Sequence, residues 1–218
     1  KIYDGKFSFN KGDRGGFIYN LRICKIYGGS FESNYSAIGG GTIYTSNTET
    51  AITYIGANTG TNTVFFNSNK SRSVGGALYG GAKGTVVIYG DTEFTGNFSQ
   101  KSHGGAIYAC GVLLISNADF KDSSAKNGGA IYCEGSNCTI TNSKFYDNVQ
   151  DNPSTNYCGG GAIYLIDSNA NIQNCEFINI IVHLFMQRLF ILRNIKNIIN
   201  KLKIGKNIKL NSVILMIE

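Results

Sequence analysis

The stretch Gly104-Gly105-Ala106-Ile107-Tyr108 decides the fold, because closely similar pentapeptides recur along the chain. Each copy has two glycines, a variable residue, Ile or Leu, and then Tyr. A short motif repeated many times is the signature of a repeat architecture, in which each unit buries its apolar side only against its neighbours. The spacing of the copies is uneven, which indicates a constant strand core with loops of different length. The copies begin at Gly15, Gly40, Gly75, Gly104, Gly128 and Gly160.

A second motif, Ile-x-Asn-x-x-Phe-x-x-Asn, lies between these copies. Ile140, Asn142, Phe145 and Asn148 give it in full. Its apolar residues alternate with turn-forming Asn, which tolerates the left-handed backbone conformation and can stack in hydrogen-bonded rows. The other Phe-x-x-Asn copies, some with one change, begin at Phe7, Phe31, Phe66, Phe94, Phe120 and Phe177.

Together the two motifs predict an all-β right-handed parallel β-helix of about six to seven coils over residues 1–179. Ile2, Asp4, Phe7 and Asn10 supply the end of a coil whose beginning is missing, which predicts a fragment with an incomplete N-terminus. Alternation along a strand places Ile and Tyr on opposite faces. We expect Ile inside and Tyr in an outward ladder, the opposite orientation being the alternative. This ladder is the candidate partner-binding surface, and the alternative is that its side chains only pack against their neighbours on the sheet. The ladder consists of Tyr19, Tyr44, Tyr79, Tyr108, Tyr132 and Tyr164.

The composition narrows the function classes. The chain has 28 Gly, one Pro and no Trp, with 13 Tyr and 13 Phe, a balance typical of strands joined by tight turns. Residues 1–180 carry 13 basic and 13 acidic side chains, so the net charge of +6 arises in the last part of the chain. A neutral body argues against nucleic-acid binding, which needs clustered positive charge.

The six cysteines have no spacing typical of a zinc site, and we expect no metal and no cofactor. Two interpretations stay open: they fill inward positions as free thiols, or some of them pair as disulfides. They are Cys24, Cys110, Cys133, Cys138, Cys158 and Cys175.

Some parallel β-helices cleave polysaccharides with clustered carboxylates, and that enzyme class is the alternative function. We interpret the acidic candidates as solvated turn residues, and His103, which precedes a Gly-Gly pair, as a turn residue too. The candidates are Asp91, Asp119, Asp122, Asp147 and Asp167, with Lys121 and Lys144 in register.

The interleaved Gly-Gly-Ala-Ile and Phe-x-x-Asn motifs resemble the repeats of the chlamydial polymorphic outer membrane protein family, over residues 1 to about 179. The resemblance implies a non-enzymatic β-helical passenger at the cell surface or outer membrane, or secreted, which acts in adhesion or antigenic display. Its expected partner is a host or neighbouring cell-surface protein or glycan. Contact with a membrane would then run through segments outside this chain.

From residue 180 to 218 the sequence changes character, with abundant Ile, Leu, Lys and Asn. Three hypotheses compete: an amphipathic helix that caps the last coil, a basic helix on a membrane surface, or out-of-frame translation. The apolar face of such a helix would consist of Phe185, Leu189, Leu192, Ile195, Ile199 and Leu202.

Overall fold

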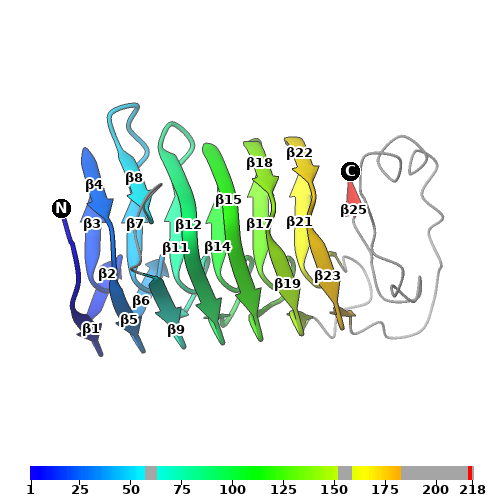
Figure 1. Ribbon diagram of the computed structural model, residues 1–218, viewed down its shortest axis with the longest axis horizontal. Helices are drawn as coiled ribbons and strands as arrows, with labels where there is room; N and C mark the ends of the chain where they lie inside the picture. The colour runs from blue at the N-terminus through cyan, green and yellow to red at the C-terminus, as the bar shows by residue number, and fades with distance from the viewer. Residues whose placement is uncertain (57–62, 152–158, 183–215, 218) are drawn as a thin grey trace.

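The computed structural model describes residues 1–56, 63–151, 159–182 and 216–217. In these residues the chain forms strands joined by turns, without a helix. Every pair of strands is parallel, and the coils stack into a β-solenoid of about six turns. Figure 1 shows the coils side by side along the long axis of the molecule. The predicted all-β parallel β-helix is confirmed.

Sheet C contains the strands of the Gly-Gly-x-Ile-Tyr motif. Its parallel register places Ile or Leu beside Ile or Leu, and Tyr beside Tyr, from one coil to the next. The sheet consists of β3 (Ile18–Asn20), β7 (Ile43–Thr45), β11 (Leu78–Gly80), β14 (Ile107–Ala109), β17 (Ile131–Glu134), β21 (Ile163–Ile166) and β25 (Met216–Ile217).

Sheet A follows sheet C in each coil and is the widest sheet, because most coils contribute two strands to it or one long bent strand. The second part of each contribution carries the Phe of the Phe-x-x-Asn motif. The sheet consists of β1 (Lys6–Ser8), β4 (Ile23–Ile26), β5 (Gly29–Glu32), β8 (Ile52–Ile55), β9 (Val64–Asn67), β12 (Thr85–Thr95), β15 (Val112–Lys121), β18 (Asn137–Thr141), β19 (Lys144–Tyr146), β22 (Asn169–Gln173) and β23 (Glu176–Ile178).

Sheet B completes each coil with short strands after the Asn of Phe-x-x-Asn. It leads into the next Gly-Gly pair, so the order along the chain is sheet C, sheet A, sheet B. Sheet B consists of β2 (Lys11–Arg14), β6 (Tyr35–Gly39), β10 (Lys70–Ser71), β13 (Phe98–Ser99), β16 (Ser124–Ala125), β20 (Val149–Gln150) and β24 (Ile181–Val182).

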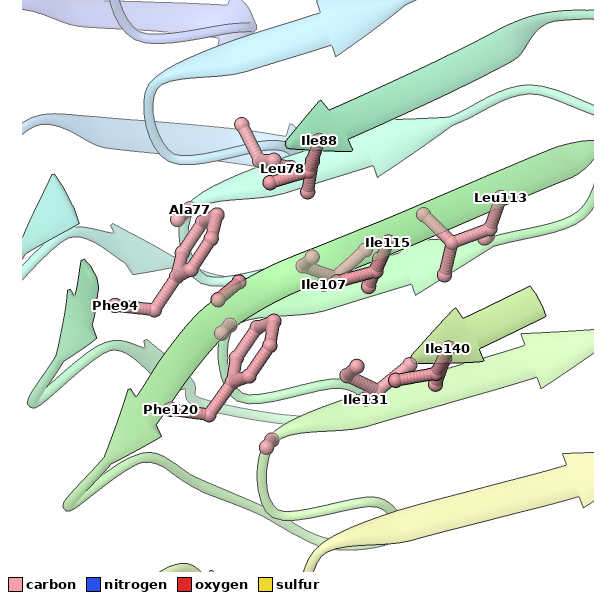
Figure 2. Packing of buried hydrophobic residues seen from close by; sticks show 14 of the residues in the cluster. Ala77, Leu78, Ile88, Phe94, Ile107, Leu113, Ile115, Phe120, Ile131 and Ile140 are labelled. Carbon is pink, nitrogen blue, oxygen red and sulfur yellow. The ribbon is translucent and has the colours of Figure 1, made fainter. Parts of the chain in front are cut away.

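The core consists of like residues stacked from coil to coil. The Phe rings from Phe7 to Phe177 form one column, with neighbouring centroids 4.8–5.0 Å apart. The five Phe side chains between these two ends of the column are fully buried. The Ile or Leu of sheet C packs beside this column, as Figure 2 shows for Leu78, Ile107 and Ile131. The prediction that Ile points inward is therefore confirmed.

The Gly-Gly pairs have two separate physical roles. The first glycine of each pair has a positive φ, between 48° and 67°, a region that L-residues with a side chain rarely adopt. In the first five pairs, the second glycine lies against the backbone of the next coil. A Cβ on Gly105 would be 1.9 Å from the carbonyl oxygen of Gly129. The motif therefore requires glycine at both positions.

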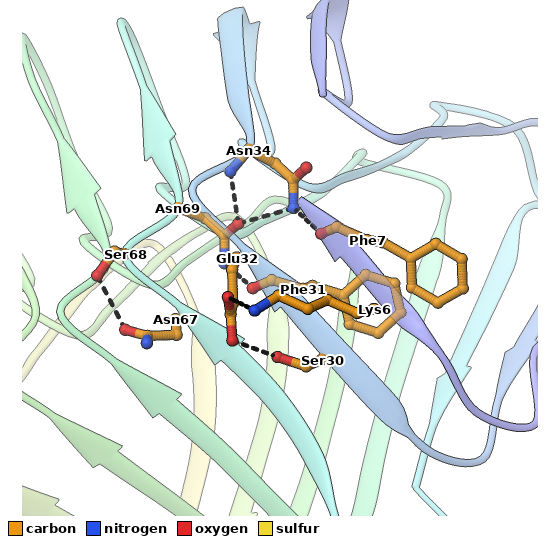
Figure 3. A network of polar contacts seen from close by, with 9 residues as sticks. All are labelled: Lys6, Phe7, Ser30, Phe31, Glu32, Asn34, Asn67, Ser68 and Asn69. Carbon is orange, nitrogen blue, oxygen red and sulfur yellow. Dashed lines mark hydrogen bonds and ion pairs between the residues drawn. The ribbon is translucent and has the colours of Figure 1, made fainter. Parts of the chain in front are cut away.

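The Asn of Phe-x-x-Asn forms a buried polar ladder beside the Phe column (Figure 3). Asn69 Nδ2 donates to the Phe31 carbonyl at 2.9 Å and to Asn97 Oδ1 at 3.1 Å. Its own Oδ1 accepts from the backbone N–H and Nδ2 of Asn34, both at 3.0 Å. Asn34 and Asn69 are thus bonded to the coils on either side, and Asn97 and Asn148 to the preceding coil, which locks the register between these coils.

The last coil reaches past residue 179. Ile180 is buried, and β24 pairs with β20, so strand pairing continues to Val182. The amphipathic helix predicted for the tail lies outside the described residues. Within the described part of the chain, no helix has the length and apolar character needed to span a membrane.

Replacement of Gly105 by Ala is expected to lower the free energy of unfolding by more than about 3 kcal/mol, because the new Cβ must displace the backbone of the next coil. Gly135→Ala is the control. Gly135 has a φ of 56°, but a Cβ added there would meet no atom within 4 Å beyond its neighbours in the chain. It should cost only about 1 kcal/mol, for the backbone conformation. Urea unfolding followed by circular dichroism measures both, and equal losses would contradict the close-approach argument.

Replacement of Asn69 by Ala is expected to cost about 3 kcal/mol, because it leaves the buried N–H of Asn34 without its acceptor and removes the side-chain bonds to Asn34 and Asn97. Asn67, two residues earlier on the same turn, is exposed. Asn67→Ala should stay within about 0.5 kcal/mol of the parent chain. Thermal unfolding of the two variants gives the comparison. A similar midpoint for both would show that the ladder contributes little.

Candidate partner-binding surface

The six tyrosines of the repeat stack into one row on the face of sheet C that points away from the Phe column. Neighbouring ring centroids lie 4.2–5.6 Å apart. Four of the five contacts are face to face, whereas Tyr19 meets Tyr44 edge-on at 69°. Each stacked ring covers the face of the next, so the row offers mainly ring edges and hydroxyl groups to a partner.

Exposure decreases along the row. Tyr19 is 47% exposed, Tyr44 and Tyr79 are half-buried, and Tyr108, Tyr132 and Tyr164 are 6–9% exposed. The last three form a second, small apolar cluster, with Val74, Cys110 and Ile166 packed against it. The sequence predicts an outward ladder, and the structure divides this row into an accessible and a covered part. Whether the row binds a partner stays a prediction.

Side chains from the corners before two of the Gly-Gly pairs cover tyrosine rings. Arg14 lies over the Tyr44 ring, with its guanidinium carbon 5.7 Å from the centroid. The His103 ring stacks on Tyr132 with centroids 4.4 Å apart. In both contacts a residue of one coil covers the Tyr of the following coil, a relation that the spacing within a single repeat does not reveal.

The covered tyrosines stay neutral hydrogen-bond donors. Burial raises the pKa of Tyr79, Tyr108 and Tyr132. The Tyr108 hydroxyl donates to the carboxylate of Glu134. Burial also raises the pKa of the neighbouring Cys110 thiol, which therefore has little thiolate character.

His103 is held neutral by its surroundings. Asn127 Oδ1 accepts from the Gly159 N–H at 3.2 Å, which turns Nδ2 of the same amide towards His103. Asn127 Nδ2 lies 3.2 Å from His103 Nδ1, so this ring nitrogen must accept and cannot carry a proton. Burial lowers the pKa of His103, and the nearby Glu134 carboxylate opposes that shift.

Three of the acidic candidates lie in turns. Asp122, Asp147 and Asp167 have φ between 49° and 52°, the left-handed conformation that Asp and Asn tolerate at corners. Asp122 and Lys121 form an exposed ion pair at 3.8 Å. These contacts agree with the interpretation of the three residues as turn formers.

The other two acidic candidates lie on sheet A. Asp91 is exposed at a register shift of β12 and accepts a 3.3 Å hydrogen bond from Asn117 Nδ2. Asp119 is in register with Lys144. Partial burial raises the pKa of Asp119, the positive charge of Lys144 lowers it, and Asp91 adds a smaller upward contribution. Within the described residues, no group of three or more His, Cys, Asp or Glu side chains could hold a metal ion.

The outer face of sheet A is a second candidate surface, whose residues lie outside the two sequence motifs. Along β12, Val86 and Ile88 point inward, while Val87 points outward and is half-buried. Its register partner Leu114 is 40% exposed. The alternation of apolar residues on both faces of these strands was visible in the sequence. We name the outward apolar side chains in two columns of three successive coils the apolar panel; Thr85, between Ile52 and Val112, is the polar member of these columns. The panel consists of Ile52, Tyr54, Val87, Val112 and Leu114.

Counting coils from the Gly15-Gly16 pair, the apolar panel ends after the fourth coil. The same two columns continue with Asn137 and Thr139 in the fifth coil and with Asn169 and Asn171 in the sixth. One continuous, regularly spaced sheet thus has an apolar half and a polar half.

Replacement of His103 by Asn is expected to reduce the loss of stability in mild acid. Below a pH of about 6.5 the unfolded chain binds a proton that the folded chain, with its lowered His103 pKa, does not accept. The free energy of unfolding of the parent chain therefore falls as the pH drops from 7.5 to 5.5, and that of the variant falls less. Urea unfolding at the two pH values measures the difference. Equal slopes would exclude His103 as the source.

Comparison with known proteins gives a match to a repeat model over a short part of the chain. No curated protein and no solved structure matches the chain. Residues 91–110 match the sequence model described as the Chlamydia polymorphic membrane protein repeat. This segment includes Phe94 and Asn97 of one coil and the Gly104–Tyr108 motif of the next. The resemblance to that repeat is thus confirmed over these residues.

Proposed function

We propose that the chain is a non-enzymatic β-helical scaffold of the cell surface, adhesin-like or antigenic in role, which binds a partner protein with the apolar panel. The repeat of a polymorphic membrane protein family supports the surface location. The solenoid supports the scaffold role, because its core residues hold the coils in register while the outer face is free to vary.

The apolar panel is the observation that carries the proposal. Tyr54, Val87 and Leu114 are register neighbours on three adjacent strands, and they lie in interior coils with strands on both sides. Adjacent strands are about 4.8 Å apart, so the panel is a compact apolar grid. Exposed apolar patches of this kind mark sites of interaction with other proteins.

A flat face also fits a protein better than a nucleic acid. The charges near the panel are few and mixed: Lys25 Nζ lies over the Tyr54 ring at 5.2 Å, and Lys6 pairs with Glu32 at 2.8 Å. A phosphate backbone would require clustered unpaired cations. Tyr19 and Tyr44, the accessible part of the tyrosine row, remain secondary candidates for a contact with protein or glycan.

Adhesion of beads coated with the full chain to cultured epithelial cells tests the proposal. The double variant Val87→Lys and Leu114→Lys should reduce bead binding at least about tenfold, because the partner would have to bury two lysine charges when it covers the panel. The matched control is Thr139→Lys with Asn171→Lys, in the same column of the same sheet two coils further along. This control should bind like the parent chain.

Two outcomes would contradict the proposal. Equal binding by both double variants would remove the panel from the contact. Release of reducing ends from a set of polysaccharides, abolished by Asp119→Asn, would instead favour the carbohydrate-active enzyme.

A further inference from the structure

Two inward columns of side chains face each other at the corner between sheet C and sheet A. One column comes from the third position of the sheet C strands, and the other from the strands that follow in sheet A. The first consists of Thr45, Gly80, Ala109, Cys133 and Leu165. The second consists of Thr53, Val86, Leu113, Cys138 and Ala170.

The side chains of the two columns are in direct contact. In the second coil, Thr45 Oγ1 and Thr53 Oγ1 are 2.7 Å apart and share a hydrogen bond. In the third coil, a Cβ on Gly80 would lie 3.2 Å from Val86 Cγ2. A disulfide needs Cβ atoms about 3.5–4.5 Å apart, with the γ atoms pointing towards each other. The columns thus run at a separation that a disulfide can bridge.

The fifth coil places a cysteine in both columns. Cys133 is the last inward residue of β17. Cys138 lies on β18, after a short turn at Gly135. Both side chains are almost completely buried, at 0% and 1% exposure. Both are thiols in the structure. A hydrogen bond with Cys133, together with burial, holds the pKa of Cys138 well above its usual range, as expected for two sulfurs in contact.

We propose that Cys133 and Cys138 form a disulfide that closes the fifth coil when the chain folds in an oxidising compartment. The bond would join sheet C to sheet A across the corner. This inference concerns the coil itself and does not depend on the binding role of the apolar panel.

The oxidant is a small-molecule disulfide such as glutathione disulfide. The thiolate of one cysteine attacks it, forms a mixed disulfide and displaces one glutathione thiolate. The thiolate of the other cysteine then attacks the protein sulfur of the mixed disulfide and displaces the second glutathione. One sulfur–sulfur bond forms in the protein and one breaks in the oxidant. The two protons and two electrons of the cysteines end on two reduced glutathione molecules.

The burial of both sulfurs places this reaction during folding. A thiol without solvent access and with a raised pKa reacts slowly, because the thiolate is the nucleophile. The exchange therefore takes place before the sixth coil stacks on the fifth and the core closes.

Peptide mapping tests the proposal on the full chain. The chain is refolded with glutathione disulfide, unfolded in urea with N-ethylmaleimide, and digested with trypsin. The peptide 127–144 contains both cysteines and no other. It should be lighter than the dithiol by two hydrogen atoms and carry no adduct. Cys24 faces Asn20 and not another cysteine across its corner, and it should carry the adduct. Two adducts on 127–144, or linkage of either cysteine to another peptide, would overturn the proposal.

Thermal unfolding gives an independent measurement. Reductant should lower the midpoint of the oxidised parent chain by roughly 5 °C. It should change the midpoint less in the double variant Cys133→Ala and Cys138→Ala, in which Ala has precedents at the register neighbours Ala109 and Ala170. An equal shift in both chains would assign the effect to other cysteines and count against the pair.

The second coil provides a matched gain of function. The double variant Thr45→Cys and Thr53→Cys places two sulfurs where the oxygens are 2.7 Å apart. It should close a new disulfide under the same refolding conditions. A folded variant that keeps both new thiols would show that the columns do not admit the bond, which would overturn the proposal for the fifth coil as well.

Discussion

The close approach of successive backbones at the second glycine of the first five pairs sets the geometry of the solenoid. A carbonyl oxygen of the next coil occupies the space that a Cβ would need, so the strands of sheet C can approach to pairing distance only where glycine is present. With that corner fixed, the Ile, Tyr and Phe positions of each coil fall directly under those of the coil before. The apolar stacks and the Asn ladder depend on this alignment, since a shift of one residue would exchange inward and outward side chains.

The repeat made most of the fold predictable. Positions that recur in every coil, such as Phe94 and Ile107, must occupy equivalent places, and alternation then separates inward from outward. What a single repeat does not show is how one coil covers the next. The burial of Tyr132 under His103 depends on a residue of the previous coil, and the loops between these residues differ in length along the chain. For the same reason, the tyrosine row could be placed on the correct face while its gradient of exposure could not.

The two candidate surfaces differ in how readily they can be recognised from the sequence. The tyrosines stand out because they recur, yet recurrence here reflects stacking of each ring on its neighbours. The panel around Val87 and Leu114 does not recur, and it becomes visible only when the register places three different strands side by side. Positions that repeat in a solenoid tend to serve the core, and surface function is more readily sought at outward positions that differ from coil to coil. Cys133 and Cys138 follow the same logic inside the molecule, as a departure from the pattern in a single coil.

Each coil contacts only the coils on either side, and equivalent residues return to the same place after every turn. The number of coils is therefore not constrained by the packing of any one of them. An unequal exchange between two copies of the coding sequence, aligned at their Gly-Gly codons, would add or remove a whole turn and leave every column of the core continuous. Longer or shorter forms of the rod would fold by the same contacts. The length of the solenoid could thus differ between related genes without any new structural element.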